Sequence, residues 1–165
     1  MIKIKILNPI KDRNEPTFRP FAFMQNRLRD YSIELTNSDD FDFLIIGMSD
    51  FWDMSMTLED SVDWGLNNIE KINQGGDYFL FDGFDSTSLL GSYEVFEKSN
   101  AIYLFKNQML KDKNQYKNTY AYGKYWFGTG SGLDVSYDIP DDIWSRIKLS
   151  GFNLGCQLPD YHNHV

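Results

Sequence analysis

The N-terminal part of the chain predicts a strand, a helix and a second strand. Isoleucine and lysine alternate over Ile2–Ile6, which is the two-residue period of a strand whose two faces differ. A helix is expected from about Pro16, because apolar side chains recur there at helical spacing. This apolar stripe consists of Phe21, Met24, Leu28 and Tyr31. The segment Ser32–Thr36 then predicts the second strand.

Two later segments, Phe41–Met48 and Tyr78–Phe81, are almost continuously apolar, as inner strands of a parallel sheet are. A helix is expected between them, capped by the preceding Thr57 and with an apolar stripe that runs from Leu58 to Ile72, and a further strand is expected at Ala101–Phe105. The helix expected before that last strand has an apolar stripe made of Leu89, Tyr93 and Phe96. This alternation predicts an α/β fold, a single doubly wound Rossmann-like (flavodoxin-like) domain with a mainly parallel sheet.

The C-terminal third of the chain has a different pattern. A polar, tyrosine-rich stretch follows Lys106, and Pro140 begins the last expected helix, which ends at Gly151. Its inward positions are Ile143, Trp144 and Ile147. We expect one α/β domain over residues 1–155 and a polar tail over residues 156–165.

Charge and cysteine content narrow the class of protein. The 165 residues include 16 Lys and Arg against 24 Asp and Glu, which gives a net charge of −8 and makes nucleic acid an unsuitable partner. No apolar run approaches the ~20 residues that span a bilayer, so no membrane span is expected. The single cysteine, Cys156, excludes an internal disulfide and fits a reducing compartment. These features predict an acidic cytoplasmic protein.

The candidate ligand site begins with the segment Asp82–Ser88, which lies between a predicted strand and a predicted helix. Ligands of parallel α/β sheets bind at the carboxyl ends of strands, where helix N-termini present free N–H groups. Gly83 allows close approach of the main chain, Ser86 offers a hydroxyl, and Asp82 and Asp85 suit sugar hydroxyls. The alternative is a tight strand-to-helix turn with a serine or threonine cap.

Asp50 and Trp52 follow the other inner strand and are expected at the same edge of the sheet. An aromatic face stacks on a sugar ring while neighbouring carboxylates accept its hydroxyls, although Trp52 would equally suit a lid over the core. Asp82 or Asp85 is the candidate general base, provided that burial raises its pKa.

Four other motifs do not predict a metal or cofactor site. Asp40-Phe41-Asp42 precedes a strand instead of following one, and the glycine-rich residues 128–132 lack the lysine of a P-loop. His162 and His164 lie in the polar tail, and Cys156 has no histidine near it in the sequence. We therefore expect neither a bound metal nor a cofactor.

Three segments carry a resemblance to a known class of enzyme. They are Leu58–Leu66, Asp77–Leu89 and Ser99–Gln108, and they resemble the N-terminal half of bacterial and phage-encoded glycosyltransferase-like proteins of the GT-B architecture, which have two Rossmann-type domains. The resemblance covers roughly residues 40–155 and implies an acceptor-binding half. It also implies a carbohydrate or nucleotide-sugar ligand and a second domain or protein partner. Because the donor-binding half and its Glu-x7-Glu signature are absent from this sequence, we expect no independent catalysis.

Two other functions suit the same sequence. One is a non-enzymatic protein-interaction or structural module that uses a Tyr/Trp-rich surface over residues 116–127, since Tyr and Trp are enriched at interfaces. Its aromatic residues are Tyr116, Tyr120, Tyr122, Tyr125 and Trp126. The other is a small nucleotide or flavin binder of flavodoxin-like fold.

Overall fold

The computed structural model describes residues 1–7, 25–48, 58–72, 77–83, 87–89, 91–117 and 136–150. Its strands are β1 (Ile2–Leu7), β2 (Ile33–Thr36), β3 (Phe43–Gly47), β4 (Tyr78–Asp82), β5 (Leu104–Lys106) and β6 (Ile147–Leu149). Its helices are α2 (Gln25–Asp30), α3 (Leu58–Ile72), α4 (Ser92–Glu97) and α5 (Asp141–Arg146), with a 3₁₀ turn, η2 (Lys113–Lys117).

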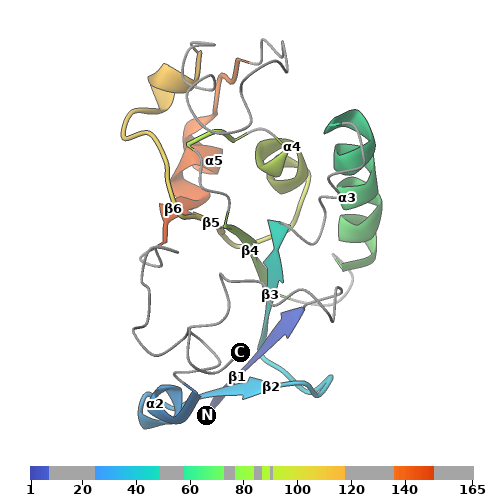
Figure 1. Ribbon diagram of the computed structural model, residues 1–165, viewed down its shortest axis with the longest axis vertical. Helices are drawn as coiled ribbons and strands as arrows, with labels where there is room; N and C mark the ends of the chain where they lie inside the picture. The colour runs from blue at the N-terminus through green and yellow to red at the C-terminus, as the bar shows by residue number, and fades with distance from the viewer. Residues whose placement is uncertain are drawn as a thin grey trace, which may run out of the picture.

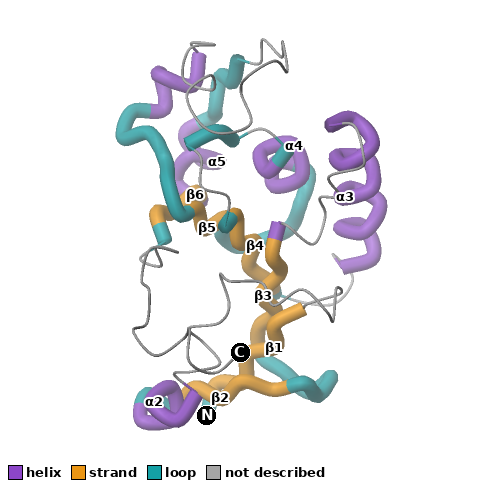
Figure 2. Tube along the Cα trace, viewed as in Figure 1, coloured by secondary structure: helices purple, strands orange, loops and turns teal. Residues whose placement is uncertain are grey.

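The strands form a six-stranded sheet in the order β2-β1-β3-β4-β5-β6, which crosses the molecule as one twisted ribbon (Figure 2). Each neighbouring pair is parallel. The predicted α/β Rossmann-like fold is therefore confirmed, and its first five strands follow the flavodoxin-like order. The two apolar segments chosen as inner strands are β3 and β4, in the middle of the sheet.

Helices α3, α4 and α5 cover one face of the sheet between β3 and β6 (Figure 1). The core lies beneath them, where apolar residues of β3, β4, β5 and β6 pack with apolar residues of the helices. Buried members from the strands are Ile46, Leu80, Leu104 and Ile147, and those from α4 and α5 are Tyr93, Val95, Phe96 and Ile143. Leu89 and the predicted α4 stripe are all buried, so that part of the helix pattern is confirmed.

Aromatic rings occupy the opposite face of the same strands. The ring of Phe79 on β4 lies 5.4 Å from that of Phe43 and 5.9 Å from that of Phe105, measured between centroids. Phe81 and Phe105 follow at 6.4 Å. The two faces therefore differ in chemistry, since the helix-covered face carries mostly aliphatic strand residues and the opposite face carries rings in contact.

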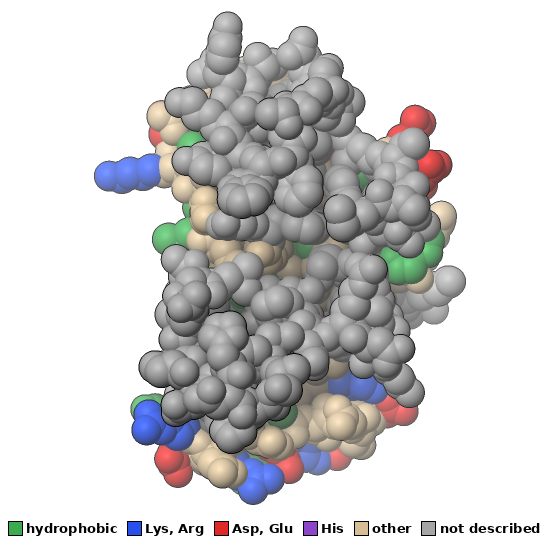
Figure 3. Space-filling model, in the orientation of Figure 1, with side chains coloured by type: hydrophobic (Ala, Val, Ile, Leu, Met, Phe, Trp, Pro, Cys, Tyr) green, Lys and Arg blue, Asp and Glu red, His purple; other side chains and the backbone are tan. Residues whose placement is uncertain are grey.

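Charged side chains concentrate at the β1–β2 end of the molecule, where basic and acidic groups alternate on the surface (Figure 3). Two lysines of β1 form ion pairs with the short connection between β2 and β3, Lys3 with Asp40 and Lys5 with Asp39. The Asp42 carboxylate accepts the main-chain N–H of Lys3 at 2.7 Å. The carboxylates of Asp40 and Asp42 are thus both engaged by β1.

Two expectations about helices are wrong. The last helix does not continue to Gly151: it ends at Arg146, and Ile147 is already extended, with φ −89° and ψ 124°. Ile147 stays buried but does so as the first residue of β6, where it pairs with Leu104. Tyr31 is 76% exposed, because α2 ends at Asp30 and Tyr31 belongs to the turn before β2. Residues 16–24 of the predicted first helix lie outside the described residues.

Candidate functional site

The carboxyl ends of β3, β4, β5 and β6 meet along one edge of the sheet. Gly47 pairs with Phe81, and Asp82 pairs with Lys106, which pairs in turn with Leu149. Asp82 follows Tyr78 and Leu80 at every second position of β4, so its side chain lies on the face that the helices cover. This edge therefore brings together the last residues of four strands.

A buried ion pair joins the ends of β4 and β5. The Lys106 ammonium donates a hydrogen bond to Oδ2 of Asp82 at 2.5 Å, and the two side chains are 0% and 2% exposed. Removing two charges from water costs several kcal/mol per ion, which close contact between opposite charges offsets. Each charge consequently depends on the other to remain buried.

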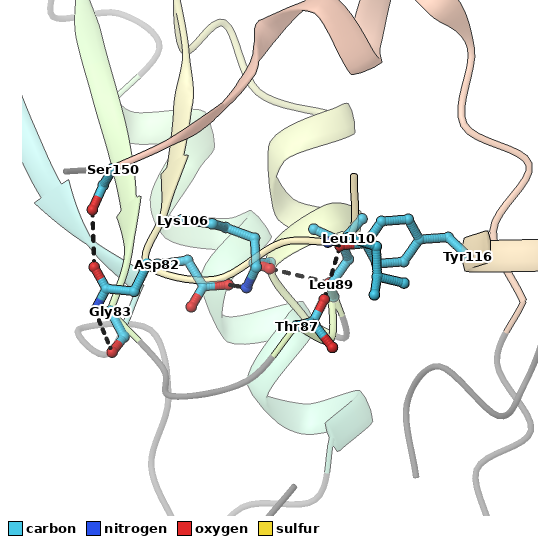
Figure 4. A network of polar contacts seen from close by, with 10 residues as sticks. Asp82, Gly83, Thr87, Leu89, Lys106, Leu110, Tyr116 and Ser150 are labelled. Carbon is cyan, nitrogen blue, oxygen red and sulfur yellow. Dashed lines mark hydrogen bonds and ion pairs between the residues drawn. The ribbon is translucent and has the colours of Figure 1, made fainter. Parts of the chain in front are cut away.

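A hydrogen-bonded chain of three residues lies beside this ion pair (Figure 4). The Ser150 hydroxyl donates to Oδ1 of Asn107 at 2.9 Å, and Nδ2 of Asn107 donates to the Gly83 carbonyl at 3.1 Å. The main chain repeats the link, since the N–H of Ser150 donates to the Lys106 carbonyl at 2.6 Å. The first residue after β4 is thereby tied to β5 and to the end of β6.

Tyr116 holds the segment between β4 and α4 at a second point, Thr87. Its hydroxyl donates to the Thr87 carbonyl at 2.9 Å and accepts the N–H of Leu110 at 2.9 Å (Figure 4). Burial raises the pKa of Tyr116 to about 12, the Leu110 N–H lowers it, and the negative charge of Asp82 raises it further. The hydroxyl therefore keeps its proton, and its donor function, at neutral pH.

Of the predicted site residues, Asp82 and Gly83 lie at this carboxyl edge. Asp50, Trp52, Asp85 and Ser86 lie outside the described residues. Asp82 is engaged by Lys106, so a ligand would reach its carboxylate only after the edge opened. Its role as a sugar acceptor or general base stays a prediction, as does the same role for Asp85.

The prediction that Tyr116 belongs to a Tyr/Trp-rich surface over residues 116–127 is wrong. Tyr116 is fully buried, and its ring lies 5.9 Å from that of Trp144, so it belongs to the core and not to an exposed interface. The burial of Tyr116 could not be predicted from its polar sequence neighbours, because its ring packs in the core while its hydroxyl hydrogen-bonds to the main chain. Tyr120, Tyr122, Tyr125 and Trp126 lie outside the described residues.

Within the described ranges, no three His, Cys, Asp or Glu side chains gather in a way that would hold a metal ion. Nor is any helix of that part of the chain long and apolar enough to cross a membrane.

Sequence reasoning missed Lys106, Asn107, Tyr116 and Ser150 as members of this site. One signal was available for Lys106, because a lone charge ends the apolar strand Leu104–Lys106 just as Asp82 ends the strand beside it. Asn107 and Tyr116 both donate to main-chain carbonyls, and such acceptors carry no sequence signal.

Comparison with known proteins adds no relative. The sequence matches no protein-family model, no curated protein and no solved structure.

Proposed function

We propose that this chain binds a carbohydrate at the carboxyl edge of its sheet, as the acceptor-binding domain of a glycosyltransferase-like protein. The observation that supports the proposal is the parallel pairing of β3 with β4, in which Gly47 lies beside Phe81. Ligands of open α/β sheets bind outside the carboxyl ends of strands, near the point where the strand order reverses. In this sheet that point lies between β1 and β3.

The proposed contacts come from the segments that follow β3 and β4. Asp50 and Trp52 follow β3, and Gly83, Asp85 and Ser86 follow β4. The indole would stack on a sugar ring, the carboxylates would accept its hydroxyls, and the serine would donate. Asp82 is assigned a supporting role, because its carboxylate is 2% exposed and bound to Lys106.

No independent catalysis is proposed. If proton transfer does occur at this edge, Asp85 is the better candidate base, because Asp82 would first have to leave its cation.

The experiment is a thermal unfolding series with a panel of simple sugars, including glucose, galactose, N-acetylglucosamine and maltose. A ligand at ten times its Kd stabilises the native state by about 1.4 kcal/mol, which for a chain of this size raises Tm by about 3–6 °C. Trp52→Ala is expected to remove the shift while the free protein stays folded. The matched control is Trp64→Ala on α3, an exposed tryptophan whose loss should leave the shift unchanged.

Two results would count against carbohydrate binding. One is the absence of any shift in the wild-type protein with each sugar at about 50 mM, well above the millimolar Kd of a weak ligand. The other is an equal loss of the shift in Trp52→Ala and Trp64→Ala, which would mean that the tryptophan after β3 has no special part.

A mononucleotide ligand is the second candidate, and the flavodoxin-like order of the first five strands favours it. Titration of FMN with the protein separates the two ligands. Quenching of flavin fluorescence at micromolar protein, with no thermal shift from any sugar, would replace the carbohydrate by a nucleotide.

A further inference from the structure

The connection from β4 to α4 is held at Gly83 and at Thr87 by side chains from another part of the chain. The Gly83 carbonyl accepts from Asn107 at 3.1 Å, and the Thr87 carbonyl accepts from Tyr116 at 2.9 Å. Both donors come from the stretch that follows β5, as Figure 4 shows for Tyr116. Both bonds hold main-chain atoms, so they fix Gly83 and Thr87 whatever side chains the connection carries.

The Asn107 amide is itself held in one orientation. The Gly83 carbonyl can only accept a hydrogen bond, so the amide presents Nδ2 to it, and Oδ1 then accepts from the Ser150 hydroxyl at 2.9 Å. A rotated amide would offer the Gly83 carbonyl an acceptor instead of a donor. Ser150 therefore adds a second hydrogen bond to the orientation of Asn107 that holds Gly83.

The Tyr116 hydroxyl is fixed in the same way. Its oxygen accepts the Leu110 N–H at 2.9 Å, which directs the O–H toward Thr87. The ring is fully buried, and the Tyr116 carbonyl accepts the N–H of Tyr137 at 2.9 Å, so neither end of the residue is free to move.

We propose that Asn107 and Tyr116 are positioning residues that hold the main chain of Gly83 and Thr87 in the β4–α4 connection, with Ser150 supporting the Asn107 amide. That this connection contacts a carbohydrate rests on the proposed function. The positioning itself does not, because it concerns the geometry of Gly83 and Thr87. The Asp82–Lys106 ion pair holds the end of β4 against the end of β5, immediately before Gly83.

The test compares two tyrosine-to-phenylalanine variants that each delete one buried hydroxyl. Tyr116→Phe removes the donor to Thr87. Tyr78→Phe is the matched control, since Tyr78 is 1% exposed and its hydroxyl accepts the Asn100 N–H at 3.1 Å, at the opposite end of β4. Both variants should lower Tm by a similar amount.

Main-chain carbonyl ¹³C NMR signals of Gly83 and Thr87 then separate positioning from general stability. Tyr116→Phe should shift the Thr87 carbonyl signal, which loses its hydrogen-bond donor, while Tyr78→Phe leaves both signals in place. Ser150→Ala, which keeps the Asn107 side chain but frees its amide, should shift Gly83. Asn107→Asp, which replaces the donor by a charge, should shift it further, with the exposed Asn26→Asp on α2 as its control.

Sugar affinity gives the second readout. If the wild-type protein binds a sugar, Tyr116→Phe and Asn107→Asp should weaken binding about tenfold, because a displaced main chain misplaces the contacting groups, and Tyr78→Phe should not. Equal signal changes in Tyr116→Phe and Tyr78→Phe, or unshifted Gly83 and Thr87 signals in the folded variants, would overturn the positioning role. If the NMR differences appear but wild type binds no sugar, the carbohydrate proposal fails and the positioning role stands.

Discussion

The guanidinium of Arg146 lies over the ring of Phe96, with its central carbon 4.8 Å from the ring centroid. The same side chain donates hydrogen bonds to the carbonyls of Ala101 and Ile102, the second at 3.3 Å. One planar group on α5 thus joins α4 to the chain that leads into β5. It closes the end of the core opposite to the candidate site.

Arg146→Lys is expected to destabilise the protein by about 1–2 kcal/mol, although it keeps the charge. A lysine ammonium cannot stack on Phe96 and reach two carbonyls at once, as the planar, forked guanidinium does. Urea unfolding measures the change. Arg27→Lys, on the exposed face of α2, is the control and should be neutral; an equal loss in both variants would mean that stacking and forked bonding contribute nothing.

Lys106→Met should destabilise the protein by about 3–5 kcal/mol, since it leaves the Asp82 carboxylate buried without its cation. The double variant Lys106→Met with Asp82→Leu should recover most of that loss, because two apolar side chains need no compensating charge. The free energy of unfolding in urea measures both, and the exposed Lys98→Met serves as control. A double variant as unstable as the single one would show that the pair contributes more than mutual neutralisation.

Stability should fall in alkaline solution partly through Tyr116. An unfolded tyrosine ionises near pH 10, whereas burial chiefly raises the pKa of Tyr116 to about 12. Between these values the unfolded state releases a proton that the folded state keeps. The contribution of Tyr116 to the free energy of unfolding is therefore complete below pH 10. It is lost as pH rises toward 12, and the free energy of unfolding falls by up to about 1.4 kcal/mol per pH unit.

Urea unfolding at a series of pH values from 9 to 11.5 checks this prediction. Tyr116→Phe should make the alkaline fall shallower, and Tyr31→Phe, which removes an exposed hydroxyl, should not. Tyr93, whose pKa burial and its bond to Glu97 also raise to about 12, should account for part of the fall that remains. Identical slopes in wild type and Tyr116→Phe would contradict the assignment.

The middle of the fold could be predicted because its signals are local. β3 and β4 are short apolar runs, and the positions Leu89, Tyr93 and Phe96 repeat at helical spacing, so each segment reports its own environment. The fold class followed from their alternation. The same reasoning placed Asp82 and Gly83 at the carboxyl edge, where the structure has them.

The rest depended on contacts that no local pattern contains. β6 is three residues long and follows α5 without a turn, so its strand character appears only through its pairing with β5. The Lys106 ammonium can be buried because it pairs with Asp82, which lies 24 positions away in the sequence at the end of the neighbouring strand. The hydrogen bonds of Asn107 and Tyr116 to main-chain carbonyls are likewise specified by tertiary structure alone.

The parallel sheet has a consequence for how the chain reaches its native state. None of the strand pairs in the described residues can begin as a hairpin, since their nearest partners in sequence, such as Leu80 and Leu104, are 24 positions apart, and Leu104 and Ile147 are 43 apart. Such non-local pairing slows folding. During synthesis β3, β4 and β5 emerge in order, so the outer edge of β5 stays unpaired until Ile147 has left the ribosome. The nascent sheet thus carries an open edge, the kind of site at which chains aggregate, until a three-residue strand bearing Lys148 covers it.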